Sequence, residues 1–168
     1  APLPTLEVVE LRRNLGAVRL RLGDTAGAVR YTKQALAAGE ASLRADHPTM
    51  LEVRENLASV LHADGRTDEA IETGWAALVA TETKFGSDNA ALVGPLINLG
   101  VMMMDGGDFD GAKAMLVRAE TIGRLEHGRD SLGVADAQTN LALLAWHEGE
   151  VDDARAFAER ALDTYAQT

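Results

Sequence analysis

Residues 56–78, with the sequence NLASVLHADGRTDEAIETGWAAL, decide the fold of this chain because their pattern recurs at a fixed spacing. An Asn-Leu pair followed by Gly or Ala returns every 42 residues, and so do the glycine and the two alanines that come after it. The recurrent positions are Asn14, Asn56, Asn98 and Asn140; Gly23, Gly65, Gly107 and Gly149; Ala28, Ala70, Ala112 and Ala154; and Ala35, Ala77, Ala119 and Ala161. Self-similarity without insertions through four copies is typical of a repeat architecture.

Each copy is predicted to form two helices, because its apolar residues recur three and four positions apart on both sides of one glycine. In the second copy they are Met50, Val53, Leu57, Val60 and Leu61, then Ile71, Trp75, Leu78 and Phe85 with Ala70 and Ala77 beside them. Gly65 between the two sets can adopt the left-handed conformation that ends a helix. No segment shows the strict alternation of a strand. The four copies are expected at about 5–48, 49–90, 91–132 and 133–168.

Three kinds of residue make local predictions about these helices. The recurrent Asp46, Asp88 and Asp130 are expected to cap the helix that follows each of them. Small residues are expected where the two helices of a copy approach closely, since a larger side chain would push them apart. Besides Ala28 and its equivalents, these are Gly16, Ala58, Gly100 and Ala142. Pro95 should make its helix begin late, near Gly94, or kink.

Composition excludes several classes of function. The chain has 168 residues, with 16 Lys and Arg against 26 Asp and Glu, a net charge of −10. Contacts to phosphates need clustered cations, so we expect neither a nucleic-acid ligand nor an anionic membrane surface. There is no cysteine, which removes disulfides and thiol nucleophiles. No uncharged apolar run is long enough to span a bilayer.

The spacing resembles that of the tetratricopeptide repeat (TPR), and more closely its 42-residue, kinesin-light-chain-like form. The match is carried by the segments at 46–48 (DHP), 56–58 (NLA), 65–70 (GRTDEA) and 77–78 (AL). The resemblance implies an all-α, right-handed α-solenoid of four tandem helix-turn-helix repeats with eight helices, forming one array over 1–168. A four-bladed propeller has a similar period but needs four strands in each copy. HEAT-type repeats have a similar length.

The sequence shows no recognisable catalytic or metal-binding pattern. The histidines, His47, His62, His127 and His147, include no pair at the three- or four-residue spacing of helical metal ligands. His47 is interpreted as a helix-start residue, and His147 as part of a solvated helix end. Acidic pairs such as Asp68-Glu69 lie at helix starts, where the helix dipole favours anions. We expect a protein that is not an enzyme and uses no cofactor or metal.

The resemblance implies a concave groove lined by the first helix of each repeat. The residues expected to line it are Asn14, Asn56, Asn98, Asn140, Arg13, Glu52, Glu55, Ile97, Val101, Met104 and Leu143. Its first half is mostly acidic and its second half apolar. Of the three consecutive methionines 102–104, Met103 is expected in the core and only Met104 at the groove. A partner segment with basic and apolar anchors would complement this surface.

The four recurrent asparagines, called here the asparagine ladder, allow two hypotheses. An amide side chain both donates and accepts hydrogen bonds, so it can hold the backbone of an extended peptide of any sequence. The resemblance implies this role. Alternatively, each asparagine bonds to the neighbouring repeat and fixes the stacking. The sequence alone leaves both hypotheses open, and the resemblance favours the first.

The expected function is non-catalytic binding of a protein or peptide partner in the groove. One alternative is self-association through exposed terminal helix faces, since the last helix has an apolar stripe of Ala154, Phe157, Ala161, Leu162 and Tyr165. Another is sensing of a small ligand near Ile97, Val101, Met104 and Leu143 within a larger regulator. The start without Met and the uncovered last helix suggest a fragment of a longer protein. A cytoplasmic, bacterial protein is expected, the latter from 13 Arg against 3 Lys.

Overall fold

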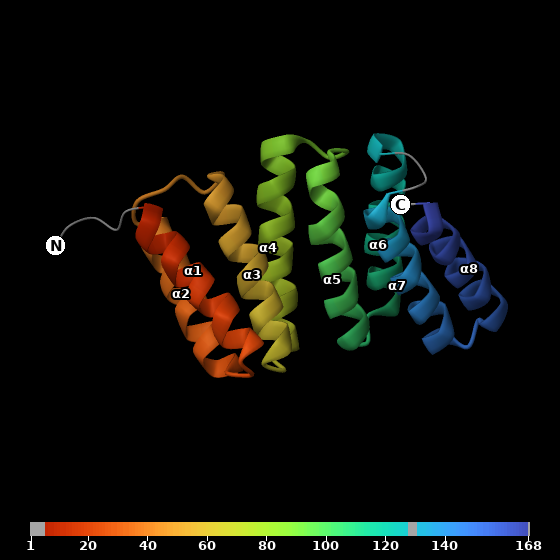
Figure 1. Cartoon of the computed structure of the whole chain (residues 1–168), viewed down its shortest axis with the longest axis horizontal. Helices are drawn as coiled ribbons and strands as arrows, with labels where there is room; N and C mark the ends of the chain where they lie inside the picture. The colour runs from red at the N-terminus through yellow and green to blue at the C-terminus, as the bar shows by residue number, and fades with distance from the viewer. Residues whose placement is uncertain (1–5, 128–130, 168) are drawn as a thin grey trace. The chain divides into compact units, whose positions relative to one another are not determined.

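The fold is all-α, as predicted. The computed structural model describes residues 6–127 and 131–167, and this part of the chain forms eight α-helices and one 3₁₀ turn, with no strand. In chain order they are α1 (Leu6–Arg21), α2 (Thr25–Glu40), α3 (Pro48–Ala63), α4 (Thr67–Phe85), η1 (Ala90–Leu92), α5 (Val93–Asp105), α6 (Phe109–His127), α7 (Leu132–Glu148) and α8 (Val151–Gln167) (Figure 1). Each copy of the 42-residue pattern therefore contains one pair of helices.

The turn inside each pair has the same hydrogen bonds in all four copies. Gly65 has φ +77°, its N–H donates to the His62 carbonyl at 2.9 Å, and the next N–H, of Arg66, donates to the Leu61 carbonyl at 3.0 Å. The other three recurrent glycines have φ between +78° and +84° and matching pairs of bonds. These bonds satisfy carbonyls that the end of a helix leaves free. The prediction that the glycine ends the first helix is confirmed.

The recurrent small residues lie where the helices of a pair approach most closely. A Cβ at Gly100 would lie 2.9 Å from Leu116 Cγ and 3.4 Å from the Ala112 carbonyl oxygen. A Cβ at Gly16 would collide with the hydroxyl of Thr32 on α2. The recurrent alanines opposite are buried. Close packing thus explains the small residues, as predicted.

The first helix of each later copy is capped one residue after the position predicted. The caps are His47 for α3, Asn89 for η1 and Ser131 for α7, and each side chain accepts a hydrogen bond from a backbone N–H of the first turn. The prediction for Asp46 and Asp88 is therefore wrong, and Asp130 lies outside the described residues. Asp46 instead bonds to Arg44, with Arg44 Nε 3.0 Å from Asp46 Oδ1. His47 was correctly assigned to the helix start.

Pro95 delays a helix, as predicted. The chain forms the 3₁₀ turn η1 first, and α5 begins only at Val93. Pro95 is then the third residue of α5, where a missing N–H costs nothing because the first four N–H groups of a helix have no partner within it.

The core-facing side of α4 differs from the predicted stripe. Ala70, Ala77 and Leu78 are buried, but Trp75 and Phe85 are exposed. Gly74 and Thr81 complete the buried side. The buried side of α4 therefore consists of Leu78 and small residues rather than aromatic ones.

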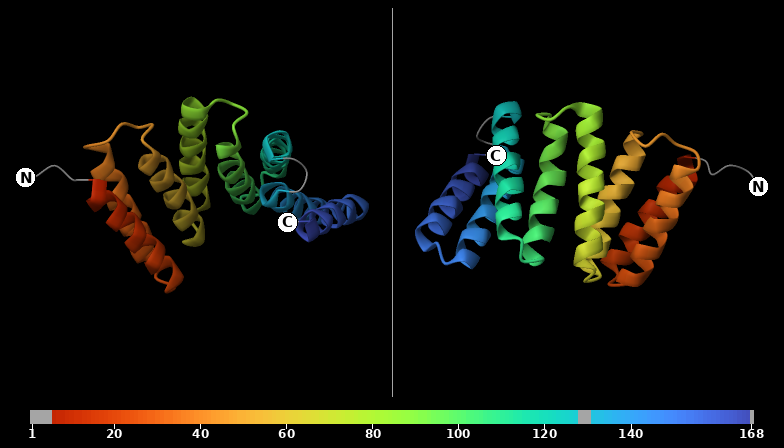
Figure 2. Two further views of the ribbon diagram at one scale, coloured as in Figure 1. Left: turned by 45° about the horizontal axis from the view of Figure 1, so that its top comes forward. Right: turned by 180° about the vertical axis from the view of Figure 1, so that it is seen from behind.

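The chain divides into two compact units, residues 1–84 and 85–168. In the first unit α1 and α2 run side by side and α3 packs against both (Figure 2), and Val9, Ala35, Ala38 and Val53 form a buried cluster between them. In the second unit α5 packs on α6, α7 on both, and α8 on α7.

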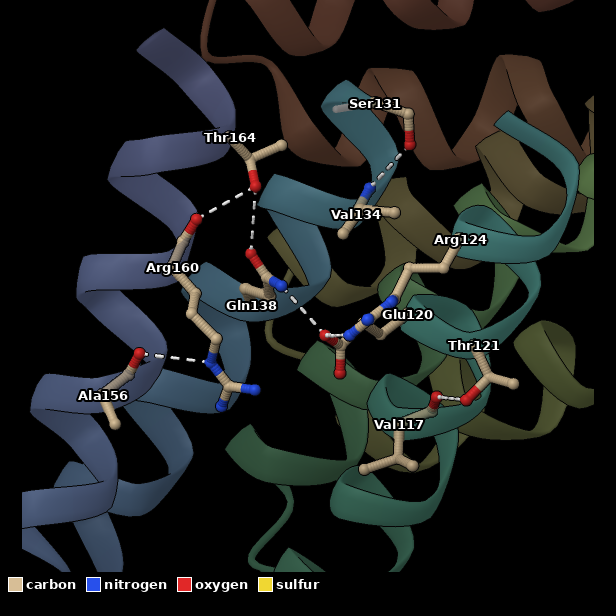
Figure 3. A network of polar contacts seen from close by, with 10 residues as sticks. All are labelled: Val117, Glu120, Thr121, Arg124, Ser131, Val134, Gln138, Ala156, Arg160 and Thr164. Atoms are coloured by element: carbon tan, nitrogen blue, oxygen red, sulfur yellow. Dashed lines mark hydrogen bonds and ion pairs between the residues drawn. The ribbon is translucent and has the colours of Figure 1, made fainter. Parts of the chain in front are cut away.

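A polar network crosses the second unit from α6 to α8 (Figure 3). The buried Gln138 on α7 donates from Nε2 to Glu120 Oε1 on α6 at 2.9 Å, and Arg124 Nη1 lies 3.3 Å from the same oxygen. Thr164 on α8 has its hydroxyl 3.5 Å from Gln138 Oε1. Gln138 thus joins three helices of two successive repeats through hydrogen bonds.

Candidate functional site

In the first unit the predicted groove residues lie on the neighbouring helices α1 and α3. Arg13 on α1 forms an ion pair with Glu52 on α3, so two predicted residues are held together across a repeat boundary. Asn14 is exposed beside them, and its Oδ1 lies 3.4 Å from Arg13 Nη2. A carboxylate, a guanidinium and an amide are therefore presented on one surface. Sequence spacing placed these residues on one side but did not reveal the ion pair.

Glu55 and Asn56 lie beside this group on α3, and both are half-buried. Burial raises the pKa of the Glu55 carboxyl. The carbonyl of Glu55 accepts a hydrogen bond from the Ser59 hydroxyl at 3.1 Å, within the same helix. A half-buried carboxylate is a stronger binding partner for a cation than one in bulk water, because its local dielectric is lower.

In the second unit the predicted residues of α5 form a more apolar surface. Ile97, Val101 and Met104 are half-buried, and Asn98 is exposed beside them. Met103 is buried, as predicted. The difference in character between the acidic and the apolar predicted residues is thus also a difference between the two units.

The asparagine ladder does not make the inter-repeat bonds of the stacking hypothesis where its bonds are described. Asn14 bonds to its neighbour Arg13. Asn140, half-buried on α7, donates from Nδ2 to the Asp136 carbonyl of the same helix at 2.9 Å. These two amides therefore hold no neighbouring repeat within the described residues.

Leu143 lines a cleft between α7 and α8 of about 650 Å³. This α7–α8 cleft is lined by Thr139, Ala142, Leu143, Trp146, Val151, Ala154, Arg155, Ala158, Ala161, Leu162 and Tyr165. Its rim is open to solvent, since Trp146 is 65% and Leu162 67% exposed. Ile97, Val101 and Met104 do not line it, so the four residues of the ligand-sensing hypothesis do not share this cleft.

The cleft also corrects the predicted stripe of the last helix. Ala154, Ala161, Leu162 and Tyr165 line the α7–α8 cleft, but Phe157 lines a second, smaller cleft. The guanidinium of Arg160 stacks over the Phe157 ring at 4.3 Å. Phe157 therefore borders a different cleft from the rest of the stripe.

The smaller cleft, of about 190 Å³, is charged. Lys113 Nζ lies 3.5 Å from Glu148 Oε2 and 3.6 Å from Glu150 Oε2, and these two carboxylates raise the pKa of Lys113. The exposed His147 nearby stacks on Phe109 with ring centroids 6.3 Å apart. The described residues contain no group of three or more His, Cys, Asp or Glu side chains that could hold a metal ion. None of the described helices is long and apolar enough to cross a membrane.

Comparison with known proteins identifies the family. A model of the tetratricopeptide repeat matches residues 7–77 and 90–167. The chain belongs to the tetratricopeptide repeat family. A search of curated proteins by sequence gave no match. TPR domains generally mediate protein–protein interactions and are typically non-catalytic scaffolds.

Solved structures place this TPR chain beside kinesin-light-chain-like proteins. BtubC (BKLC) from P. vanneervenii is 25% identical with a TM-score of 0.82, and the alignment covers 95% of this chain and 63% of BtubC. The TPR-like repeats of a kinesin light chain from Podosopora anserina are 21% identical with a TM-score of 0.82, over 95% of this chain and 76% of the other. A Rap protein solved with Competence and Sporulation Factor is 17% identical with a TM-score of 0.82, over 96% and 43%. The two less similar structures show the fold alone.

Proposed function

We propose that this chain is a non-catalytic interaction module whose four repeats form one array and bind an extended segment of a protein partner along their first helices. The observation that supports the proposal is the exposure and regular position of the four asparagines of the ladder. Asn14 and Asn98 are exposed and Asn56 and Asn140 half-buried, at the same step in every first helix. Amides at regular spacing can pair with the backbone of an extended peptide.

The flanking side chains favour a particular chemistry in the partner. Glu52 and the half-buried Glu55 offer carboxylates to basic side chains, and Ile97, Val101 and Met104 offer apolar surface. A segment with both basic and apolar anchors would use both, and complementary charge would speed its association. The Rap structure, solved with a bound factor, is an example of a partner on a similar fold. We place the module in the cytoplasm.

The proposal is tested by selecting peptides from a random display library against the chain, with Asn56→Ala plus Asn98→Ala as the comparison variant. Extended peptides with basic and apolar residues should be enriched, and the double variant should lose them. Each lost side-chain hydrogen bond removes about 1 kcal/mol, so the two together weaken binding on the order of thirtyfold.

Two controls make the result specific. Circular dichroism must show that the double variant keeps its helices. Lys33→Ala plus Thr83→Ala changes two exposed residues on the second helices and should leave binding unchanged. Enrichment that is indifferent to the two asparagines would contradict the proposal.

A further inference from the structure

The first helix carries an apolar stripe that the first unit leaves uncovered. Leu11, Leu15, Val18 and Leu22 recur at steps of four, three and four, so they share one side of α1 and its end. Leu11 is 61%, Val18 52% and Leu22 75% exposed. Four large aliphatic side chains on one exposed face indicate a surface that is covered in a complex. These residues are called the α1 stripe.

The same positions are buried in the later first helices. Val53, Leu57 and Val60 on α3 lie 42 residues after Leu11, Leu15 and Val18, and all three are buried. Val53 packs in the cluster that includes Ala35 and Ala38 of α2. This side of α3 therefore covers the preceding helix pair, and the repeat assigns the same side to the α1 stripe.

The second unit repeats this arrangement. Ala137, Leu141 and Leu144 occupy the equivalent positions of α7 and are buried. Val134 at the start of the same side packs on α6, since a Cβ at Gly123 would lie 3.0 Å from Val134 Cγ2. A first helix thus docks through this side on the preceding pair in both units.

The α7–α8 cleft is the corresponding acceptor surface without an occupant among the described residues. Ala161 in its wall lies at the repeat position of Ala35, which contacts Val53 of the docked α3. The exposed Ala158 in the same wall is small and leaves room for a helix to approach. The cleft follows α8 from Val151 to Tyr165, about 21 Å at 1.5 Å per residue, which is long enough for the three turns, about 16 Å, that the α1 stripe spans.

Tyr165 defines how far the docked helix can reach. It stands at the repeat position of Gly39 and Gly123, which admit Met50 and Val134 of the docked helices. Its hydroxyl donates to Asp136 Oδ1 at 2.5 Å, so the ring closes this end of the cleft. The docked segment therefore begins at Leu11 rather than at Val8.

The helices that form the two surfaces also have opposite net charges. Helix α1 has four arginines against two glutamates, a net charge of +2. Helix α7 has two carboxylates and no Lys or Arg, and α8 has four carboxylates against two arginines, so the pair together carries −4. Opposite net charges favour association of these faces and oppose pairing of either face with itself.

We infer that the α1 stripe of one copy of this chain packs into the α7–α8 cleft of a second copy. The contact uses two different faces, so each bound copy retains one free stripe or one free cleft, and association continues beyond the dimer unless a ring closes. This self-association is separate from peptide binding at the asparagine ladder.

The test uses two blocked variants of the whole chain. Leu11→Glu plus Val18→Glu disables the stripe, and Ala158→Arg fills the cleft; all three residues are exposed. Sedimentation velocity over a wide concentration range should show assembly of the unaltered chain and a monomer for each variant alone. A mixture of the two variants should form a heterodimer and nothing larger, because one intact stripe and one intact cleft remain.

The matched control is Val117→Glu on α6. Val117 is an exposed apolar residue outside both faces, and its repeat equivalent on α8 is already Glu159. This variant should assemble like the unaltered chain. Circular dichroism on every variant shows whether the helices are retained.

Three outcomes would overturn the inference. The unaltered chain could stay monomeric at all concentrations. The stripe variant could still self-associate, which would show a contact that does not use the stripe. The mixture of folded variants could fail to form a heterodimer.

Discussion

The two units use the same repeat positions with different chemistry. Between the repeats of the first unit, Leu36 packs on the apolar cluster that contains Val53. In the second unit Glu120 occupies the position of Leu36, 84 residues later, and its carboxylate accepts from Gln138 and Arg124. The 42-residue step therefore determines where the helices meet, but it does not determine whether apolar packing or hydrogen bonds join them. The candidate binding surfaces of the two units also differ, because the first has acidic residues on α3 and the second has apolar residues on α5.

The largest predicted effect concerns a buried leucine that both units have at the same repeat position. Leu57→Ala in the first unit and Leu141→Ala in the second remove equivalent buried side chains. Each should lower the free energy of unfolding by about 2–5 kcal/mol, because a cavity replaces packed methyl groups. Urea denaturation measures the loss, and amide hydrogen exchange should locate it mainly in the unit that carries the change. Equal loss of protection in both units from either change would show that the units unfold together.

The second effect concerns the polar network that joins α6, α7 and α8 in the second unit. Gln138→Leu removes the amide donor from Glu120, whose side chain is only 12% exposed, and should cost about 1–3 kcal/mol. Adding Glu120→Leu makes this contact apolar, like that of Leu36, and should recover most of the loss, since no carboxylate is then left short of a partner. Urea denaturation of both single variants and the double variant gives the coupling. Purely additive losses would mean that the Gln138–Glu120 bond contributes nothing.

The smallest effect concerns the acidic surface of the first unit. Burial raises the pKa of Glu55 in the folded chain, so folding disfavours its charged form. Between the unfolded and the folded pKa the folded state binds more protons, and stability falls as pH rises through this window. Glu55→Gln should therefore stabilise the chain slightly at pH 7, and the gain should vanish in acid, where Glu55 is neutral in both states. Thermal unfolding at a series of pH values checks this. A gain that persists unchanged in acid would point to a cause other than burial of the charge.

Local features of the fold were predictable from particular residues. Gly65 ends a helix, Gly100 admits a neighbouring helix, and Pro95 delays α5, each for a reason contained in a few residues of chain. The caps were missed by one residue because Asp46 and the adjacent His47 can both accept a backbone N–H, and only the path of the loop selects His47. Composition and spacing alone could not separate these two acceptors.

The candidate site was only partly predictable. Helical spacing identified side chains on one face of a helix, but the Arg13–Glu52 pair depends on how α1 and α3 lie beside each other. Leu143 was grouped with residues of α5, but those residues do not line the cleft that Leu143 forms with α8. The spacing of residues within one helix does not reveal which residues of another helix they contact.

The sequence by itself determined the helix pairs, their turns and the close approach of the small residues, because these depend on backbone conformation and on the 42-residue step. Tertiary structure decided which apolar residues are buried. Leu15 and Leu57 occupy the same repeat position, yet Leu15 is exposed and Leu57 buried. The difference arises because α3 has a helix pair to dock on, and burial depends on what covers a side chain rather than on its place in the repeat.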